Sequence, residues 1–349
     1  MAFQPFKLKK QTPKDARNYC LNVLPNSTES ILAIPNSSNK IQILNSTNLN
    51  LISELNNEID LNNVDINFQN SLKKKKRQLK EVLTDCTFGG TENLFYTCLN
   101  DVEGTVNIWD LRSGGKVSVF KGYVPLLSIA VSCAGDLLAA GTELQEEDAK
   151  VLFWDLRNTS TKLSEFSEAH SDDITQVKFH PNFKNWLTTG STDGTLSIYN
   201  IEKTFDEDEA IFQTIRDNSI NKLGFFGPSN EYIFSLTHIE TLSIFRVEDA
   251  ETIVSFGDVR NTTKLNDSST AIDYLIDCQY ISSLMRLFVF YGTNDGNLGI
   301  LNVDLDSLDL VHKLKGGHNG LVRGAHWRRD GRSLVSCSED GVVSLWDNF

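Results

Sequence analysis

The histidines and cysteines, the side chains most often used for catalysis and metal binding, are dispersed along this 349-residue chain. The histidines are His170, His180, His238, His312, His318 and His326, and the cysteines are Cys20, Cys86, Cys98, Cys133, Cys278 and Cys337. No Cys-x-x-Cys pair occurs, which argues against a zinc site and against a redox dithiol. Phosphate-loop, nucleophile-elbow and His-Glu-x-x-His motifs are also absent from the sequence. We therefore expect no catalytic residues, no cofactor and no metal site.

The charge of the chain favours a protein partner over a nucleic acid. It has 46 acidic and 33 basic residues, for a formal net charge of −13, whereas phosphate neutralisation needs an excess of Lys and Arg on the binding surface. A basic protein partner fits such a chain better. No window approaches the roughly 18 apolar residues of a membrane span, and Met1–Phe6 lacks the apolar run of a secretory signal. We expect no membrane contact, reduced cysteines, and a location in the nucleus or cytoplasm.

A short pattern occurs seven times: a turn, often Asp-Gly, then alternating residues, then a large apolar residue followed by Asp, Asn or Arg. The closing pairs are Leu44-Asn45, Trp109-Asp110, Trp154-Asp155, Tyr199-Asn200, Phe245-Arg246, Leu301-Asn302 and Trp346-Asp347. Four of the intervals between them are 45 or 46 residues, and the other two, 65 and 56, equal this period plus an insertion. The residues before each pair alternate with the period of a strand. The sequence therefore predicts an all-β chain of seven four-stranded units.

The last unit gives this repeat a family resemblance. Gly317-His318, Trp327, Asp340-Gly341 and Trp346-Asp347 follow one another in the order found in WD-repeat (WD40) proteins. The chain resembles that family over essentially its whole length, which implies a single seven-bladed β-propeller spanning residues 1–349. The resemblance also implies buried polar tetrads that link the strands of a blade. Their members would be His318, Ser336, Asp340 and Trp346 in the seventh blade, and His170, Thr189 and Asp193 in the fourth, where Tyr199 replaces the tryptophan.

The seventh blade needs a strand from elsewhere in the chain. Only two residues follow Trp346-Asp347, too few for an outermost strand. The segment from Phe3 to Lys9 precedes the first repeat and is the spare strand available. We expect it to pair with the last blade and close the ring, which removes an exposed sheet edge.

Two insertions interrupt the repeat. The first, residues 56–77, should form a loop between blades 1 and 2 and ends in the basic run Lys73–Arg77. That run is interpreted either as a nuclear-import signal or as a solvated part of the loop. The second insertion covers residues 256–269.

Two consecutive repeats close with Trp-Asp-Leu-Arg, at Arg112 and Arg157. The motif is similar to one in WD-repeat receptors that bind the adaptor of cullin-4 ubiquitin ligases. In that interpretation the two arginines lie side by side on the bottom face and donate to acidic or carbonyl groups of the adaptor. In the alternative, each arginine pairs with a neighbouring blade.

The second half of the chain resembles the WD repeat-containing protein 89 family. The similar segments are Phe256–Arg260, Ala271–Asp277 and Lys315–Trp327. Asp258, Arg260, Asp273 and Tyr274 could mark a partner surface. In the other interpretation, Asp258 and Arg260 pair with Asp273 and hold the inserted loop against its own blade.

Propellers of this kind usually bind partners on the face where the second and third strands of each blade are joined. The residues expected to ring that face are Ser37, Val102, Glu147, Thr192, His238, Asn294 and Glu339. Two are acidic and none is Lys or Arg, which fits a basic ligand. We therefore predict a non-enzymatic scaffold, monomeric within a protein complex. The alternatives are a ligase receptor that uses Arg112 and Arg157, and an acidic carrier for a basic client.

Overall fold

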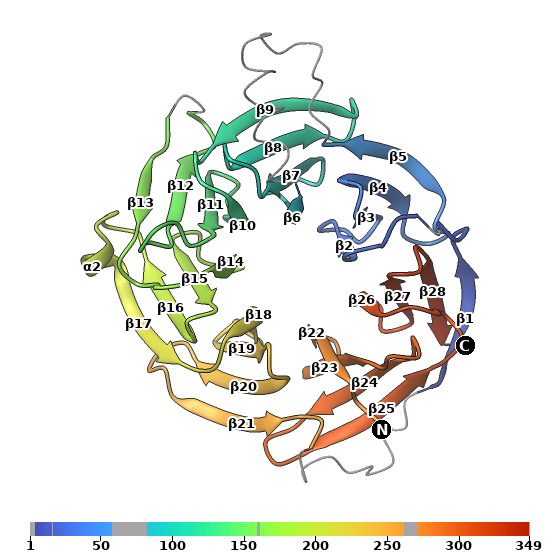
Figure 1. Ribbon diagram of the computed structural model, residues 1–349. Coiled ribbons are helices and arrows are strands. Elements are labelled where there is room, and N and C mark those ends of the chain that lie inside the picture. The colour runs from blue at the N-terminus through green and yellow to red at the C-terminus, as the bar shows by residue number, and fades with distance from the viewer. Residues whose placement is uncertain (1–3, 16, 58–81, 159–160, 262–270, 349) are drawn as a thin grey trace.

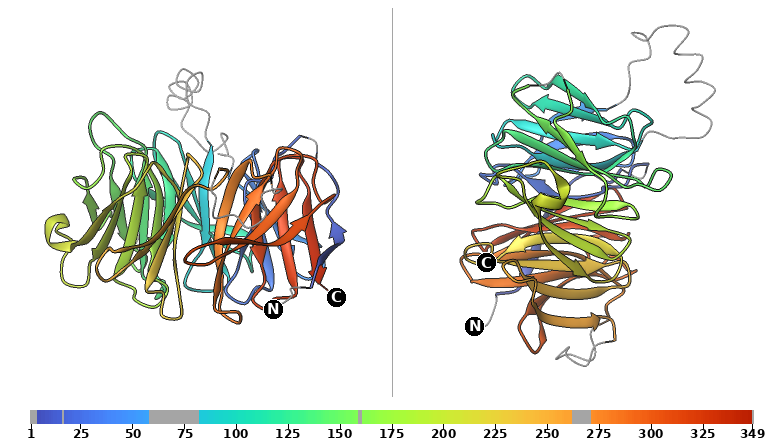
Figure 2. Two further views of the ribbon diagram at one scale, coloured as in Figure 1. Left: turned by 90° about the horizontal axis from the view of Figure 1, so that it is seen from below. Right: turned by 90° about the vertical axis from the view of Figure 1, so that its left-hand side faces the viewer.

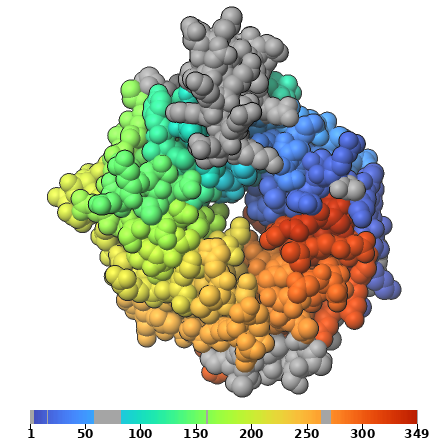
Figure 3. Space-filling view, in the orientation of Figure 1, coloured from blue at the N-terminus to red at the C-terminus, as the bar shows by residue number. Residues whose placement is uncertain are grey.

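The described residues of the computed structural model, 4–15, 17–57, 82–158, 161–261 and 271–348, form seven four-stranded antiparallel sheets arranged in a ring (Figure 1). The predicted all-β, seven-bladed propeller is confirmed. Each blade has strands a to d from the axis outward, and the seven blades follow one another around the ring in chain order (Figure 3).

The blades have the following strands. Blade 1 contains β2 (Leu24–Pro25), β3 (Ile31–Pro35), β4 (Lys40–Asn45) and β5 (Leu51–Asn56). Blade 2 contains β6 (Leu83–Phe88), β7 (Leu94–Leu99), β8 (Thr105–Asp110) and β9 (Gly115–Lys121). Blade 3 contains β10 (Leu126–Val131), β11 (Leu137–Thr142), β12 (Val151–Asp155) and β13 (Ser164–Phe166). Blade 4 contains β14 (Ile174–Phe179), β15 (Trp186–Ser191), β16 (Thr195–Asn200) and β17 (Ile211–Arg216).

Blade 5 contains β18 (Ile220–Phe226), β19 (Tyr232–Thr237), β20 (Thr241–Arg246) and β21 (Thr252–Asp258). Blade 6 contains β22 (Tyr274–Ile281), β23 (Arg286–Gly292), β24 (Leu298–Val303) and β25 (Leu308–Leu314). Blade 7 contains β26 (Val322–Trp327), β27 (Ser333–Ser338), β28 (Val343–Asn348) and, as its outermost strand, β1 (Phe6–Gln11).

The N-terminal strand closes the ring, as predicted. β1 pairs antiparallel with β28, with Phe6 opposite Asn348 and Leu8 opposite Trp346, and the two strands lie together at the rim (Figure 1). The strand starts and ends slightly later than expected from the sequence. The Phe6 ring packs edge-on against His312 of blade 6 and Trp327 of blade 7, with centroids 4.8 and 5.4 Å away.

The antiparallel order gives the disc two distinct faces (Figure 2). The b–c turns and the d–a loops between blades emerge on one face, called the top face below. The a–b and c–d turns emerge on the other, the bottom face. Each predicted closing pair lies at or next to the end of a c strand, and its first residue is at most 5% exposed. These side chains therefore belong to the core.

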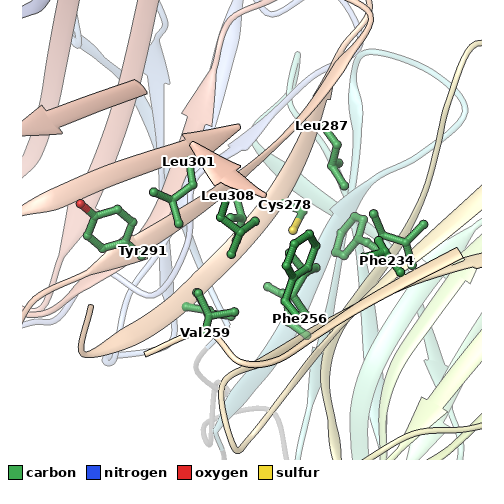
Figure 4. Close-up of a cluster of buried hydrophobic side chains, with 14 of the residues drawn as sticks. Phe234, Phe256, Val259, Cys278, Leu287, Tyr291, Leu301 and Leu308 are labelled. Carbon is green, nitrogen blue, oxygen red and sulfur yellow. The ribbon is translucent and has the colours of Figure 1, made fainter. Parts of the chain in front are cut away.

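The hydrophobic core lies mainly between neighbouring blades. Between blades 5 and 6, for example, Phe256, Cys278 and Leu287 pack in one buried cluster (Figure 4). Burial of this apolar surface from both sides is the main force holding adjacent blades together.

The insertions are only partly described. Strand β5 continues to Asn56, and residues 58–81, with the basic run Lys73–Arg77, lie outside the described residues. Strand β21 extends to Asp258, so the second insertion begins later than predicted, and its residues 262–270 also lie outside.

One short helix occurs in the described chain, α2 (Glu207–Ala210), within the acidic run 206–209. The Glu207 carboxylate accepts hydrogen bonds from the backbone N–H groups of Ser167, Glu168 and Ala169 at 2.6, 2.9 and 3.0 Å. Part of this run therefore ties blade 4 to the loop that precedes it. None of the described helical residues forms a segment of the length and hydropathy needed to span a membrane.

Candidate interaction surface

The blade 7 tetrad residues lie together around one buried hydroxyl. Ser336 Oγ lies 2.6 Å from His318 Nε2 and accepts a hydrogen bond from Trp346 Nε1 at 2.9 Å. His318 Nδ1 faces the Asp340 carboxylate at 3.8 Å, and that carboxylate accepts from the backbone N–H groups of Asn319 and Val342. Burial lowers the pKa of His318 to about 4, so the imidazole is neutral. The arrangement links the strands of the blade through one buried hydroxyl.

Blade 4 has a related network without the indole. His170 Nε2 lies 2.6 Å from Thr189 Oγ1, and His170 Nδ1 lies 3.5 Å from Asp193 Oδ2. Tyr199 stands where blade 7 has Trp346. No described group lies in good hydrogen-bonding geometry with the buried Tyr199 hydroxyl; burial raises its pKa, and the nearby Thr189 and Ser197 hydroxyls oppose that shift. The link from hydroxyl to aromatic side chain is therefore missing in this blade.

Blade 2 carries a network that the sequence analysis missed. Trp109 Nε1 donates to Thr97 Oγ1 at 3.2 Å, and Thr97 Oγ1 donates to Asn57 Oδ1 at 2.9 Å. Asn107 Nδ2 also donates to Asn57 Oδ1, at 3.0 Å. Asn57 thus takes the place that His318 has in blade 7.

The seven residues predicted to ring the top face all lie in b–c turns. Thr192 and Glu339 are half-buried, and the other five are exposed. Glu339 accepts from Arg323 Nε at 2.8 Å, and His238 Nδ1 lies 2.9 Å from Ser219 Oγ. These two side chains are therefore engaged with their own face of the propeller.

The strongest concentration of charge on the top face lies where blades 3 and 4 meet. In the b–c turn of blade 3, Glu146, Glu147 and Asp148 are exposed, and none forms an ion pair with a described residue. The adjoining loop contributes Asp172 and Asp173, and Asp173 accepts from the backbone N–H of Leu144 at 2.8 Å. Lys150, the one basic residue of this turn, is paired with Glu165 of β13 at 3.2 Å, and the loop contains no Lys or Arg. We call this surface, residues 143–148 with 172–173, the acidic patch.

The Asp258 group does not converge on one point. Arg260 binds its own neighbour, with Nε 2.8 Å from Asp258 Oδ1 and Nη2 3.0 Å from Oδ2. Asp273 instead accepts from the backbone N–H of Asn294 at 2.6 Å. The Tyr274 hydroxyl accepts from the Val322 N–H at 2.7 Å and so joins blades 6 and 7. The predicted pairing of Asp258 and Arg260 with Asp273 was wrong, because a carboxylate two residues away captures the guanidinium locally.

Arg112 and Arg157 lie in c–d turns of adjacent blades, on the bottom face. Their side chains are 71% and 72% exposed. Each guanidinium forms a two-point ion pair with the aspartate two residues before it, Asp110 or Asp155, at 2.6 to 3.0 Å. Pairing with a neighbouring blade, the alternative considered from the sequence, was therefore wrong. The same Asp-x-Arg geometry recurs at Arg260.

Comparison with known proteins shows that the chain is similar to WD-repeat proteins. Residues 160–200 and 308–347 match the WD domain, G-beta repeat family. The chain is 28% identical to a WD repeat-containing protein 89 homolog of Dictyostelium discoideum, over 77% of this chain and 72% of the relative. It is 32% identical to WD repeat-containing protein GTS1 of Arabidopsis thaliana, over 73% and 66%. An uncharacterized WD repeat-containing protein of Saccharomyces cerevisiae is 30% identical, over 70% of this chain and 62% of the relative.

Proposed function

Because the chain is a WD-repeat protein related to WD repeat-containing protein 89, we propose that it is a non-enzymatic scaffold that binds a partner protein on its top face. The observation that carries this proposal is the acidic patch, whose exposed carboxylates Glu146, Glu147 and Asp148 form no ion pair with a described residue, while Lys150 of the same turn is paired with Glu165. A rigid ring holds these groups in place before binding, so little conformational entropy is lost when the partner binds.

The chemistry of the patch favours a basic segment of the partner. Carboxylates clustered without counter-charges repel one another, and a ligand carrying Lys or Arg relieves that repulsion. The net charge of −13 adds long-range attraction for the same kind of partner. We place the protein in a complex in the nucleus or cytoplasm, and import directed by Lys73–Arg77 stays a prediction.

The test replaces Glu146→Gln, Glu147→Gln and Asp148→Asn together and measures partner recovery by affinity purification with mass spectrometry. A matched control, Glu202→Gln, Asp208→Asn and Glu209→Gln, removes the same charges from exposed positions around the c–d connection of blade 4. Partners with basic segments should disappear with the patch variant and stay with the control. Equal recovery with both variants would remove the acidic patch as the binding surface.

A ligase receptor is the second candidate, favoured by the exposure of Arg112 and Arg157 on the same face of adjacent blades. To bind an adaptor carboxylate, each guanidinium would exchange its aspartate partner or share it. An Arg112→Ala, Arg157→Ala double variant should then lose cullin-adaptor subunits in the same purification. If no adaptor subunits copurify with the wild type, the receptor function is rejected.

The third candidate, an acidic carrier, differs from a scaffold in its salt dependence. A carrier shields a basic client over a broad negative surface, so its complexes should be released by added salt. Purifications at low and high salt distinguish the two, because a scaffold with a packed interface retains its partners at high salt.

A further inference from the structure

Two cavities open on the bottom face, on either side of the a–b turn of blade 5. One, of about 430 Å³, lies between blades 5 and 6 and is lined by Phe226, Leu287 and Leu305 among others. The second, of about 440 Å³, lies between blades 4 and 5 and is lined by Phe183, Trp186 and Phe212. The turn itself, residues 227–231, contributes lining residues to both.

Large apolar side chains at the mouths of these cavities are exposed to solvent. Phe183 is 59% exposed, Met285 70% and Leu305 60%, and the three residues lie in three different turns between strands. The floor of the first cavity is part of the core, since Phe226 and Leu287 belong to the buried cluster between blades 5 and 6, in which Figure 4 labels Leu287. Apolar patches of this kind on a soluble domain commonly mark a binding surface.

The other blades do not share this feature. Their a–b turns read Asn26-Ser-Thr-Glu-Ser30, Gly89-Gly-Thr-Glu-Asn93, Ser132-Cys-Ala-Gly-Asp136 and Arg328-Arg-Asp-Gly-Arg332. None of these has a large apolar residue, whereas the equivalent turns of blades 4 and 6 carry Phe183 and Met285. Among the a–b turns of the bottom face, large apolar residues thus occur only in blades 4 and 6, on either side of blade 5.

Charged side chains line both cavities. Glu231, Glu248 and Arg246 line the cavity between blades 4 and 5, and Asp304 and Arg286 line the other. Arg246 is already held by Asp249 and Glu251, at 2.8 and 2.9 Å. The cavity between blades 4 and 5 therefore combines an apolar pocket with an excess of negative charge, whereas the charges lining the other cavity balance.

We infer that the bottom face of blades 4 to 6 binds an extended segment of a partner protein that places one large apolar side chain in each cavity, with Lys or Arg beside the side chain that enters the cavity between blades 4 and 5. The cavity volumes are within the range of small ligand sites, and buried anchors in adjacent pockets provide most of the affinity of such contacts. The surface is separate from the acidic patch and from Arg112 and Arg157, so a scaffold could hold two partners at once. This inference rests on the proposed scaffold function and adds a second site to it.

The test selects displayed random peptides on the full chain and measures the affinity of the enriched peptide by fluorescence anisotropy. We expect peptides with two large apolar residues near Lys or Arg. Phe183→Ser and Met285→Ser should each weaken binding roughly tenfold. Val117→Ser, at a 55% exposed position on β9 of blade 2, is the matched control and should leave affinity unchanged. All three positions are exposed, so the variants should fold normally.

Four outcomes would overturn the inference. In the first, the enriched peptides bind the two cavity variants as tightly as the wild type. In the second, the selection enriches no peptide. Sedimentation velocity could instead show a dimer that the Phe183 and Met285 substitutions dissociate, which would make a second copy of this chain the occupant. Peptides that lose binding only with the Glu146, Glu147 and Asp148 variant would leave the scaffold function standing and remove the bottom-face site.

Discussion

Blades 2 and 7 build the hydrogen-bond network around their c-strand tryptophan from different residues. Both close their c strand with Trp-Asp, and in both the indole N–H donates to a buried hydroxyl, Thr97 in blade 2 and Ser336 in blade 7. In blade 7 that hydroxyl contacts His318, whereas in blade 2 it donates to Asn57. The network therefore requires a polar partner for the hydroxyl, and not histidine in particular.

The two blades also differ in how they are completed. The outer strand of blade 2, β9, follows β8 directly, but that of blade 7, β1, comes from the other end of the chain. Blade 2 is closed by local sequence and has a network that does not titrate near neutral pH. Blade 7 depends on a long-range pairing and on a neutral histidine, and we expect it to be the more sensitive of the two.

The largest effect is expected from deleting residues 1–11. Blade 7 would lose its outer strand, β28 would become an exposed edge, and the contacts of Phe6 with blades 6 and 7 would be lost. We expect aggregation and loss of the wild-type elution peak in size-exclusion chromatography. A synthetic peptide of residues 4–13 should restore that peak. A deletion variant with unchanged size and unfolding midpoint would show that β1 is not needed for closure.

The second effect is on acid stability. The pKa of His318 falls from 6.5 to about 4 on burial, so between these values the unfolded chain binds a proton that the folded chain does not. The stabilisation is complete above pH 6.5 and is lost as the pH falls toward 4, by roughly 3 kcal/mol at most. Urea unfolding over this range should show the loss. His312 is shifted in the same way, so it contributes to the same decline.

Replacing His318→Asn copies the solution of blade 2 and should remove about half of this pH dependence. The amide oxygen can accept from Ser336 as Asn57 does from Thr97, and it does not titrate. A variant whose stability falls with acid as steeply as the wild type would show that His318 is not the group responsible.

The sequence predicted the blades well because each closing pair is local. The seven closing pairs, from Leu44-Asn45 to Trp346-Asp347, lie at or next to the ends of c strands. The alternating residues before each pair define the strand itself. Asn57 could not be found in this way. His318 precedes its tryptophan by 28 residues, but Asn57 precedes Trp109 by 52 because an insertion follows it. The long interval between Asn57 and Trp109 therefore hid from the sequence analysis that Asn57 occupies the position that His318 has in blade 7.

Surface features were predicted less well, for a different reason. Arg112, Arg157 and Arg260 bind aspartates two residues before them. The geometry of the turn sets this pairing, and the alternation of apolar residues along the strands does not predict it. The apolar sector of the bottom face combines Phe183, Met285 and Leu305 from three connections in two blades. No one of these residues indicates a binding surface in the sequence, because they are far apart along the chain and the ring brings them to one face.

A third, smaller effect is expected from Asn57→Ala in blade 2. The substitution removes the acceptor of both Thr97 Oγ1 and Asn107 Nδ2, which are buried, at a cost of about 2 kcal/mol in the free energy of unfolding. Ser118→Ala on β9 of the same blade is the control and should be nearly neutral. If Asn57→Ala is equally neutral in urea unfolding, then water replaces the lost acceptor and the comparison with His318 fails.

The smallest effect is expected from Tyr199→Phe in blade 4, and its comparison with Trp346→Phe in blade 7 separates hydrogen bonding from packing. Trp346→Phe in blade 7 keeps an aromatic ring but removes the donor to Ser336 and some buried volume, so it should destabilise by about 2 kcal/mol. Tyr199→Phe in blade 4 removes a buried hydroxyl that lies in good hydrogen-bonding geometry with no described group. Its removal relieves a desolvation cost without leaving a large cavity, so stability should stay constant or rise by up to about 1 kcal/mol. Urea unfolding of both variants measures the difference. A loss at Tyr199 as large as that at Trp346 would mean that its hydroxyl is hydrogen-bonded, and that blade 4 has a complete network after all.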